Sequence, residues 1–133
     1  MAPLGIRNNN PGNIRPGVGY QGENGTNGGF ATFDTPQNGI RAIFVLLRVY
    51  QQQHDLETVT GMIGRWAPPD DNNDTPAYVA HVASAMGIGA DTPFDITDKR
   101  LGPSMVAAII LHENGENPYA AAVIGQAQVA AYG

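Results

Sequence analysis

The strongest constraint on the fold is a series of five helix-length segments that occupies the chain after residue 34. The first begins with the stretch Asp34-Thr35-Pro36-Gln37, which supplies a capping side chain, a proline suited to the first turn and a capping-box glutamine. This helix is expected to run to about residue 53, and apolar side chains recur along it at helical spacing, at Ile40, Ile43, Phe44, Leu47 and Tyr50. Such a stripe predicts a helix that packs against other elements.

Four further helices are predicted from similar signals. One covers about 57–66 and is stopped by two prolines, and the next opens with Thr75 and Pro76 and ends at Gly87. A fourth begins near residue 98 and ends at 114–115, and an alanine-rich helix covers about 118–132. With 133 residues, of which 42% are apolar, the chain can bury one core but not two. We therefore predict a single, mainly helical domain over residues 1–133.

The first 34 residues differ from this helical part. Residues 5–29 are rich in Gly, Asn and Pro, which favour turns over periodic structure. The alternatives are a flexible tail and an ordered loop. Apolar anchors favour order, and these are Ile6, Ile14, Val18, Tyr20, Phe30 and Phe33. We predict an ordered loop with a short β-hairpin over 1–34 and helices over 35–133, which makes the fold class α+β and mainly α.

Composition excludes several classes of protein. Without cysteine the chain has no disulfides, no thiolate chemistry and no thiol metal site. The net charge of −5, with seven scattered cationic residues, argues against a nucleic-acid partner. No apolar stretch is long enough to cross a bilayer, and Met1 to Arg7 lacks the order of a secretion signal. We therefore expect no membrane insertion and no signal peptide.

The end of the fourth predicted helix carries a candidate acid. Glu113 stands there between His112 and Asn114, just before Gly115. A carboxyl group at a helix C-terminus lies near the negative end of the helix dipole, and apolar walls would add a desolvation cost. Both effects favour the protonated form, as a general acid for a glycosidic oxygen requires. The alternative is an ordinary solvated glutamate before a glycine C-cap.

A run of asparagines near the start is the second candidate. Residues 7–14 (RNNNPGNI) offer amide donors and acceptors that suit the hydroxyl and N-acetyl groups of sugars, but they suit turns equally well. Other motifs are incomplete. The calcium-like pattern over 70–74 lacks the later glycine and glutamate, Ser84 and Ser104 have no nucleophile elbow, and Trp66 is expected in the core. The histidines are too far apart for a zinc motif, so we expect no metal or cofactor: His54, His81 and His112.

Three stretches together resemble a group of phage and prophage virion lysins. They are RNNNPGNIR over 7–15, GFATFDTPQNGIRA over 29–42 and RWAPP over 65–69. The group includes the wall-degrading structural lysin of enveloped double-stranded RNA phages, and the similarity covers most of the chain. It implies a virion or prophage protein that acts on peptidoglycan in the periplasm, with other virion proteins as further partners. We expect the chain to be a monomer.

Wider similarities imply the chemistry and a lysozyme-like fold. NNPGNI over 9–14 is similar to a motif of bacterial glucosaminidases, and DTPAYVAHV over 74–82 resembles the end of the catalytic domain of soluble lytic transglycosylases. ENG over 113–115 resembles the glutamate-serine-glycine stretch that carries the catalytic acid in both families, with Asn114 in place of serine. In those families the glutamate comes first, whereas here it follows the other motifs, as a circular permutation would produce.

The resemblance implies a role for each matching residue. Glu113 becomes the acid and base, and Tyr78 holds the reacting sugar. The expected substrate-binding residues are Asn8, Asn9, Asn10, Asn13, Phe33 and Tyr119. Lytic transglycosylases need only one carboxylate, because the muramic acid hydroxymethyl group attacks its own ring. A hydrolase needs a second carboxylate, for which the sequence offers only Glu23, Asp34 and Glu116 through tertiary approach.

Other functions remain open at this point. A lysozyme or glucosaminidase would cut the same glycan with water, and a murein endopeptidase would cut the peptides. A virion or wall-binding protein without catalysis would bind sacculi and release nothing. The products of digestion distinguish these possibilities.

Overall fold

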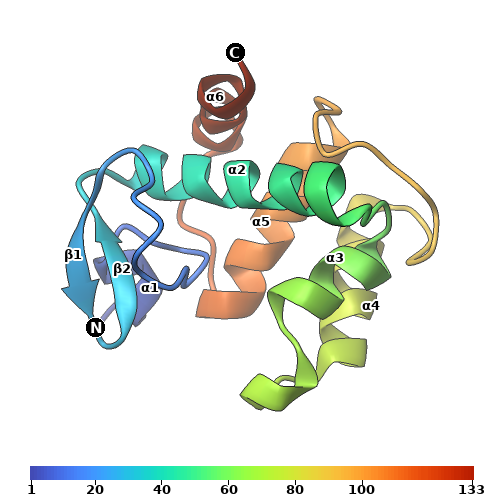
Figure 1. Ribbon diagram of the computed structural model, residues 1–133, viewed down its shortest axis with the longest axis horizontal. Coiled ribbons are helices and arrows are strands. Elements are labelled where there is room, and N and C mark those ends of the chain that lie inside the picture. Colours follow the sequence, from blue (N-terminus) through green and yellow to red (C-terminus); the bar gives the residue numbers. More distant parts are fainter.

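The computed structural model describes residues 1–133, and its longest element, helix α2 (Pro36–His54), runs across the middle of the molecule (Figure 1). The helix starts where the sequence predicts. The Thr35 side chain accepts a hydrogen bond from the backbone N–H of Asn38, and Pro36 occupies the first turn. It ends at Asp55, which adopts a left-handed conformation. Its apolar stripe is covered by β2, α3, α5 and α6, so α2 is the centre of the core.

The remaining helices confirm the predicted series. They are α3 (Val59–Trp66), α4 (Thr75–Met86), α5 (Leu101–Asn114) and α6 (Ala121–Tyr132), with a single 3-10 turn, η1 (Pro69–Asp71), after α3. Helix α5 begins three residues after Asp98. The Asp98 carboxylate accepts hydrogen bonds from the backbone N–H groups of Arg100 and Leu101, which have no partner within the helix. Helix α6 begins later than predicted because the Asn117 side-chain oxygen accepts a hydrogen bond from the N–H of Tyr119, which forms a turn before the helix.

The N-terminal segment is ordered and carries the predicted hairpin. Strands β1 (Glu23–Asn27) and β2 (Phe30–Phe33) pair antiparallel, with a bulge between Glu23 and Gly25. The one-turn helix α1 (Leu4–Arg7) was not predicted, because four residues are too few to show a helical period. The fold is therefore mainly α with a short β region, as predicted.

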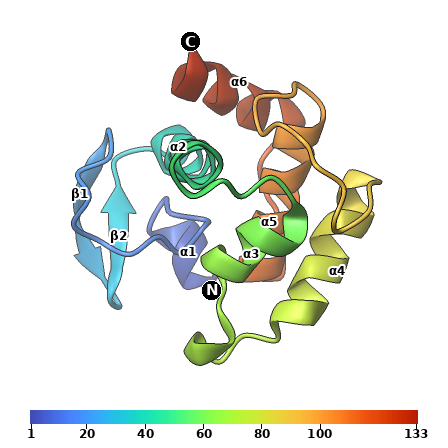
Figure 2. The ribbon, with the colours of Figure 1, turned by 45° about the vertical axis from the view of Figure 1, so that its right-hand side comes forward.

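All parts of the chain share one core. Its 25 buried apolar residues form a single cluster, to which the N-terminal segment contributes Ile14, Ala31 and Phe33. Helix α2 and the N-terminal loop approach so closely that a Cβ at Gly39 would collide with the backbone carbonyl of Asn9. Figure 2 shows the N-terminal loop and α1 between the hairpin and α5. None of the helices has both the length and the apolar character that crossing a bilayer requires.

Candidate active site

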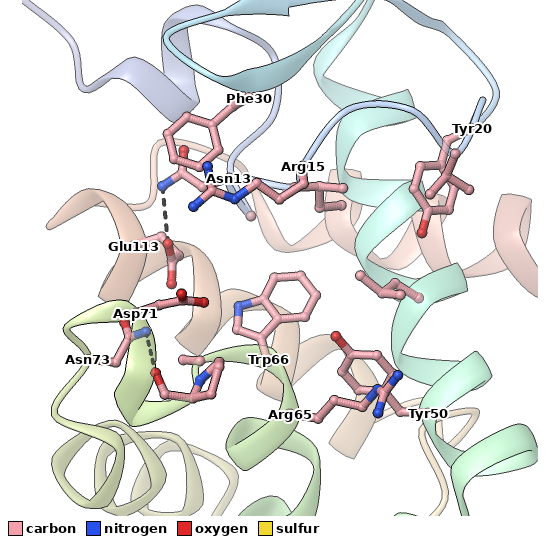
Figure 3. A pocket seen from close by; sticks show the side chains of 16 residues that line it. Asn13, Arg15, Tyr20, Phe30, Tyr50, Arg65, Trp66, Asp71, Asn73 and Glu113 are labelled. Carbon is pink, nitrogen blue, oxygen red and sulfur yellow. Dashed lines mark hydrogen bonds between the residues drawn. The ribbon is translucent and has the colours of Figure 1, made fainter.

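A cleft of about 460 Å³ opens between the N-terminal loop and the helices (Figure 3). The loop and β2 form one wall, and α2, α3, η1 and the end of α5 form the other. Half of its 16 lining residues are hydrophobic. The lining consists of Gly12, Asn13, Ile14, Arg15, Val18, Tyr20, Phe30, Leu46, Tyr50, Arg65, Trp66, Ala67, Pro68, Asp71, Asn73 and Glu113. Such a mixture of aromatic surface and a few polar groups is typical of ligand sites.

Glu113 lies at one end of this cleft with both carboxylate oxygens engaged. The Tyr78 hydroxyl donates to Oε2 at 2.9 Å, and the Asn13 amide donates to Oε1 at 3.1 Å. Asn13 and Tyr78 are separated from Glu113 by 100 and 35 positions in the chain. The three residues singled out by sequence therefore meet within hydrogen-bond distance. The side chain is partly exposed, so its carboxylate is open to a ligand from the cleft side.

Tyr78 contacts Glu113 from outside the cleft. Its side chain has no exposed surface and does not line the cleft, so the structure does not place it where the expected contact with a sugar would be made. The His112 ring stacks on it, with centroids 3.6 Å apart. Burial raises the pKa of the Tyr78 phenol far above its ordinary value, and the neighbouring Glu113 charge raises it further. The phenol therefore remains a neutral donor to the carboxylate.

Asn13 is held in place by the end of α5. The Asn114 amide donates to the carbonyl oxygens of Pro11, at 2.8 Å, and Ile110, at 2.9 Å. The side-chain oxygens of Asn13 and Asn114 are buried without a conventional donor and lie close to Gly5, where a Cβ would come within 2.9 and 2.5 Å of them. A side chain at this position would force these amides to shift. Asn114 thus joins the N-terminal loop to the helix that carries Glu113.

The other asparagines build the loop instead of facing the cleft. Asn10 is fully buried, and its amide donates to the carbonyls of Ile14 and Ala31 while its oxygen accepts from the Ile14 N–H. Asn8 is 4% exposed and exchanges hydrogen bonds with Asn27, and Asn9 donates to the Phe33 carbonyl. The side-chain amides of these three residues form hydrogen bonds within the N-terminal segment. We therefore reassign the three from substrate binding to stabilising the loop.

The two aromatic residues predicted to bind substrate also lie outside the cleft. Phe33 is 3% exposed and belongs to the core. Tyr119 is half-buried, and its hydroxyl oxygen is buried without a hydrogen-bond partner. Burial raises the pKa of the Tyr119 phenol. Of the six predicted binding residues, only Asn13 lines the cleft.

Sequence reasoning missed the aromatic walls. Trp66, expected in the core, lies in the middle of the cleft, with Tyr50 and Tyr20 toward one end and Phe30 above (Figure 3). Trp66 and Tyr50 also contact each other edge to face, with centroids 6.5 Å apart. Flat aromatic faces can pack against the C–H faces of a sugar ring. The signal was present in the sequence only as the RWAPP stretch, which carries Arg65 and Trp66.

A second carboxylate also lines the cleft, and it is Asp71 of η1. None of the three candidates considered from sequence is found there. The Glu23 carboxylate accepts hydrogen bonds from the backbone N–H groups of residues 17, 19 and 20, and Asp34 accepts one from the Asn38 amide. Glu116 lies past the end of α5 and is exposed. In Figure 3 Asp71 lies on the same side of the cleft as Glu113.

The histidines and the calcium-like stretch have local structural roles. His81 and His112 bring their Nδ1 atoms to 3.4 Å, and burial lowers the pKa of His112. Asp74 caps α4 by accepting the N–H of Ala77. No three His, Asp or Glu side chains are grouped in a way that could hold a metal ion.

The chain is similar to one phage protein over nearly its whole length. No protein-family model matches it. It is 40% identical over 124 residues to a protein named Protein P5 from Pseudoalteromonas phage PM2. The match covers 89% of this chain and 75% of the phage protein. Because the similarity extends over most of both chains, it concerns the whole fold and not a short motif.

Proposed function

The chain belongs to the same family as protein P5 of Pseudoalteromonas phage PM2, and we propose that it is a virion enzyme that cuts the glycan strands of bacterial peptidoglycan by lytic transglycosylation. Glu113 is the acid and base. The observation that carries this proposal is one carboxylate, held by Tyr78 and Asn13, at the end of an aromatic-walled cleft. The proposed place of action is the cell wall, which lies in the periplasm of a Gram-negative host.

The surroundings of Glu113 hold its side chain in one place at the end of the cleft. It lies in the last turn of α5 and accepts hydrogen bonds from two donors, the Tyr78 hydroxyl and the Asn13 amide. Because Tyr78 and Asn13 bind one oxygen each, they also fix the direction of the carboxylate plane.

The reaction then follows in two steps with one residue. Glu113 first protonates the glycosidic oxygen between the muramic acid and the next sugar, and the bond from that oxygen to C1 breaks. The Glu113 carboxylate next takes the proton from the C6 hydroxyl of the muramic acid, and O6 forms a bond to C1. The product is an anhydro ring, and no water is consumed. Tyr78 and Asn13 serve as positioning residues.

A second candidate is a hydrolase, which Asp71 favours. Two carboxylates on one cleft are the arrangement that hydrolysis of a glycoside requires, one as acid and the other as nucleophile or base. Asp71 is exposed and makes no salt bridge, so it is free to move toward a substrate. In this mechanism the Asp71 carboxylate would activate water or attack C1 directly.

Digestion of purified sacculi, with mass spectrometry of the products, tests the proposal. We expect anhydro-muramic ends from the wild type, and a roughly 10²–10⁴-fold lower rate from Glu113→Gln, which keeps the shape but cannot give up a proton in the same way. Reducing ends would support the hydrolase, and free peptides would indicate an endopeptidase. Binding to sacculi without release of any fragment would indicate a non-catalytic wall-binding protein.

Two matched variants complete the test. Glu116→Gln makes the same change three residues away, outside the cleft, and should digest sacculi at the wild-type rate. Asp71→Asn separates the two glycosidase mechanisms, because transglycosylation does not use that carboxylate while hydrolysis does. Full activity of a folded Glu113→Gln would remove the basis of the assignment.

A further inference from the structure

Two of the seven cationic residues of this acidic chain lie on the cleft. Arg15 comes from the N-terminal loop, and Arg65 from the last turn of α3. Neither guanidinium forms a salt bridge within 4.0 Å, although Glu113 and Asp71 line the same cleft. Neither makes a hydrogen bond within the protein, whereas Arg7, Arg41 and Arg100 each donate to a backbone carbonyl.

Aromatic rings hold both guanidinium groups in place. The Arg15 guanidinium carbon lies 4.8 Å from the centroid of the Phe30 ring, and that of Arg65 lies 5.3 Å from the centroid of Tyr50. Burial raises the pKa of the Tyr50 phenol to about 12, although Arg65 lowers it. The phenol is therefore neutral at physiological pH and cannot serve as a counter-ion. Stacking orients each guanidinium but leaves its positive charge and its N–H edge uncompensated.

The charges are separated along the cleft. Figure 3 shows Glu113 and Asp71 at one side, Arg65 with Tyr50 and Tyr20 at the other, and Arg15 on the upper wall, with Trp66 between them. A ligand that fills the cleft from Glu113 to Tyr20 therefore passes two free guanidinium groups. A planar guanidinium with a free edge matches a carboxylate, to which it can donate two parallel hydrogen bonds.

We propose that Arg15 and Arg65 form a carboxylate-binding subsite that recognises the acidic groups carried by the glycan. This inference rests on the proposed function, because it concerns the substrate of the same cleft. Peptide-bearing glycan presents carboxylates on its peptides, and glycan stripped by an amidase presents one on each muramic acid. A polymer of N-acetylglucosamine presents none. The subsite thus selects the acidic wall polymer over neutral glycans despite the protein's net negative charge.

Binding measurements on the inactive Glu113→Gln protein test the subsite, because that background leaves the sacculi intact. Co-sedimentation with peptide-bearing sacculi should weaken at least about tenfold when Arg15→Gln or Arg65→Gln is added. Raising the salt concentration should weaken the parent and have less effect on the double variant, since screening acts on charge. Affinity for soluble N-acetylglucosamine oligomers should stay the same. Amidase-stripped glycan shows whether peptide or muramic carboxylates are bound.

Arg48→Gln is the matched control. The Arg48 guanidinium also stacks on an aromatic ring, 5.0 Å from the centroid of Tyr132, but lies outside this cleft. The Arg48→Gln substitution should leave the affinity for sacculi unchanged. Circular dichroism should show that every variant is folded. Equal losses on acidic and neutral glycans, or no loss on either, would overturn the subsite. Absence of any binding to sacculi would overturn it as well.

The two proposals fail in different ways. If Glu113→Gln retains activity while the arginine variants lose affinity for acidic glycan, the subsite stands and Glu113 is not the acid. If the wild type binds sacculi through the arginines but releases no fragment, the chain is a wall-binding protein. If digestion gives anhydro products and the arginine variants bind sacculi normally, the proposed transglycosylase function is supported and the proposed subsite is wrong.

Discussion

The N-terminal segment over 1–34 and the helices over 35–133 are stabilised in different ways. Residues 35–133 supply 22 of the 25 core residues, all of them in helices except Ala67 and Ile96, and this part is held by apolar burial. The N-terminal segment supplies three, and is held by amide side chains that bond to its own backbone, with Asn10 at its centre. The cleft has one wall of each kind. The helical wall carries Glu113 and two of the aromatic groups, and the loop wall carries the Asn13 amide that donates a hydrogen bond to Glu113.

Removing the largest fully buried side chain of α2 should have the greatest effect. Phe44 has no exposed surface and packs edge to face on Tyr132, with centroids 5.9 Å apart. Phe44→Ala should lower the free energy of unfolding by about 4 kcal/mol, through lost burial and the cavity left behind. Urea unfolding followed by circular dichroism measures it. Val129→Ala, which is half-exposed on α6, should change stability by less than about 0.5 kcal/mol. Equal effects would mean that the helices are not held by this core.

Asn10→Ala should have a smaller and more local effect. It removes three buried hydrogen bonds, so the Ile14 N–H loses its partner and the Ile14 and Ala31 carbonyls each lose one donor, at a cost of about 2 kcal/mol. We expect faster hydrogen exchange at 8–33, and lower digestion of sacculi because Asn13 loses its position beside Glu113. Helix content should be unchanged. The exposed Asn24→Ala is the control. Uniform loss of protection throughout the helices would contradict a division between the two regions.

The smallest effect should come from Glu23, which holds the loop that carries Tyr20. Hydrogen bonds from the backbone lower the pKa of its carboxyl, that from Gly17 most, against a smaller opposing effect of burial. Because the folded pKa lies below the unfolded one, Glu23 contributes stability above about pH 4.5 and loses it as the pH falls through the folded pKa. The difference in unfolding free energy between wild type and Glu23→Gln should shrink from about pH 5 to about pH 3. A constant difference would show that the loop does not depend on this carboxylate.

The two regions also differ in how far the sequence predicts them. The five long helices were predicted because their signals are local, such as Thr35-Pro36 ahead of α2 and Thr75-Pro76 at the start of α4. The four residues of α1 and the three of η1 are too short to show any period. The sequence indicated that the asparagines are important, but it could not show which of them stabilise the loop and which line the cleft. Asn10 points into the fold and Asn13 into the cleft, and only the path of the turn between them decides this.

The candidate site was predicted in part for the same reason. Glu113, Tyr78 and Asn13 were identified from motif resemblance, and they meet in the structure. Trp66 shares the helical spacing of the core residue Ile63, so its pattern indicates burial, and only its place at the end of α3 brings it to the cleft. Arg15 and Arg65 are 50 positions apart in the sequence, and nothing local indicates that they share one cleft.

The bond between Asn13 and Glu113 joins residues 100 positions apart, and Asn114 reaches back 103 positions to Pro11. During synthesis the loop is made about 100 residues before the end of α5, so a nascent chain carries the loop wall of the cleft before Glu113 has been added. Local helices can form early, whereas contacts this distant in sequence form slowly. The assembled cleft therefore exists only after α5 has been translated.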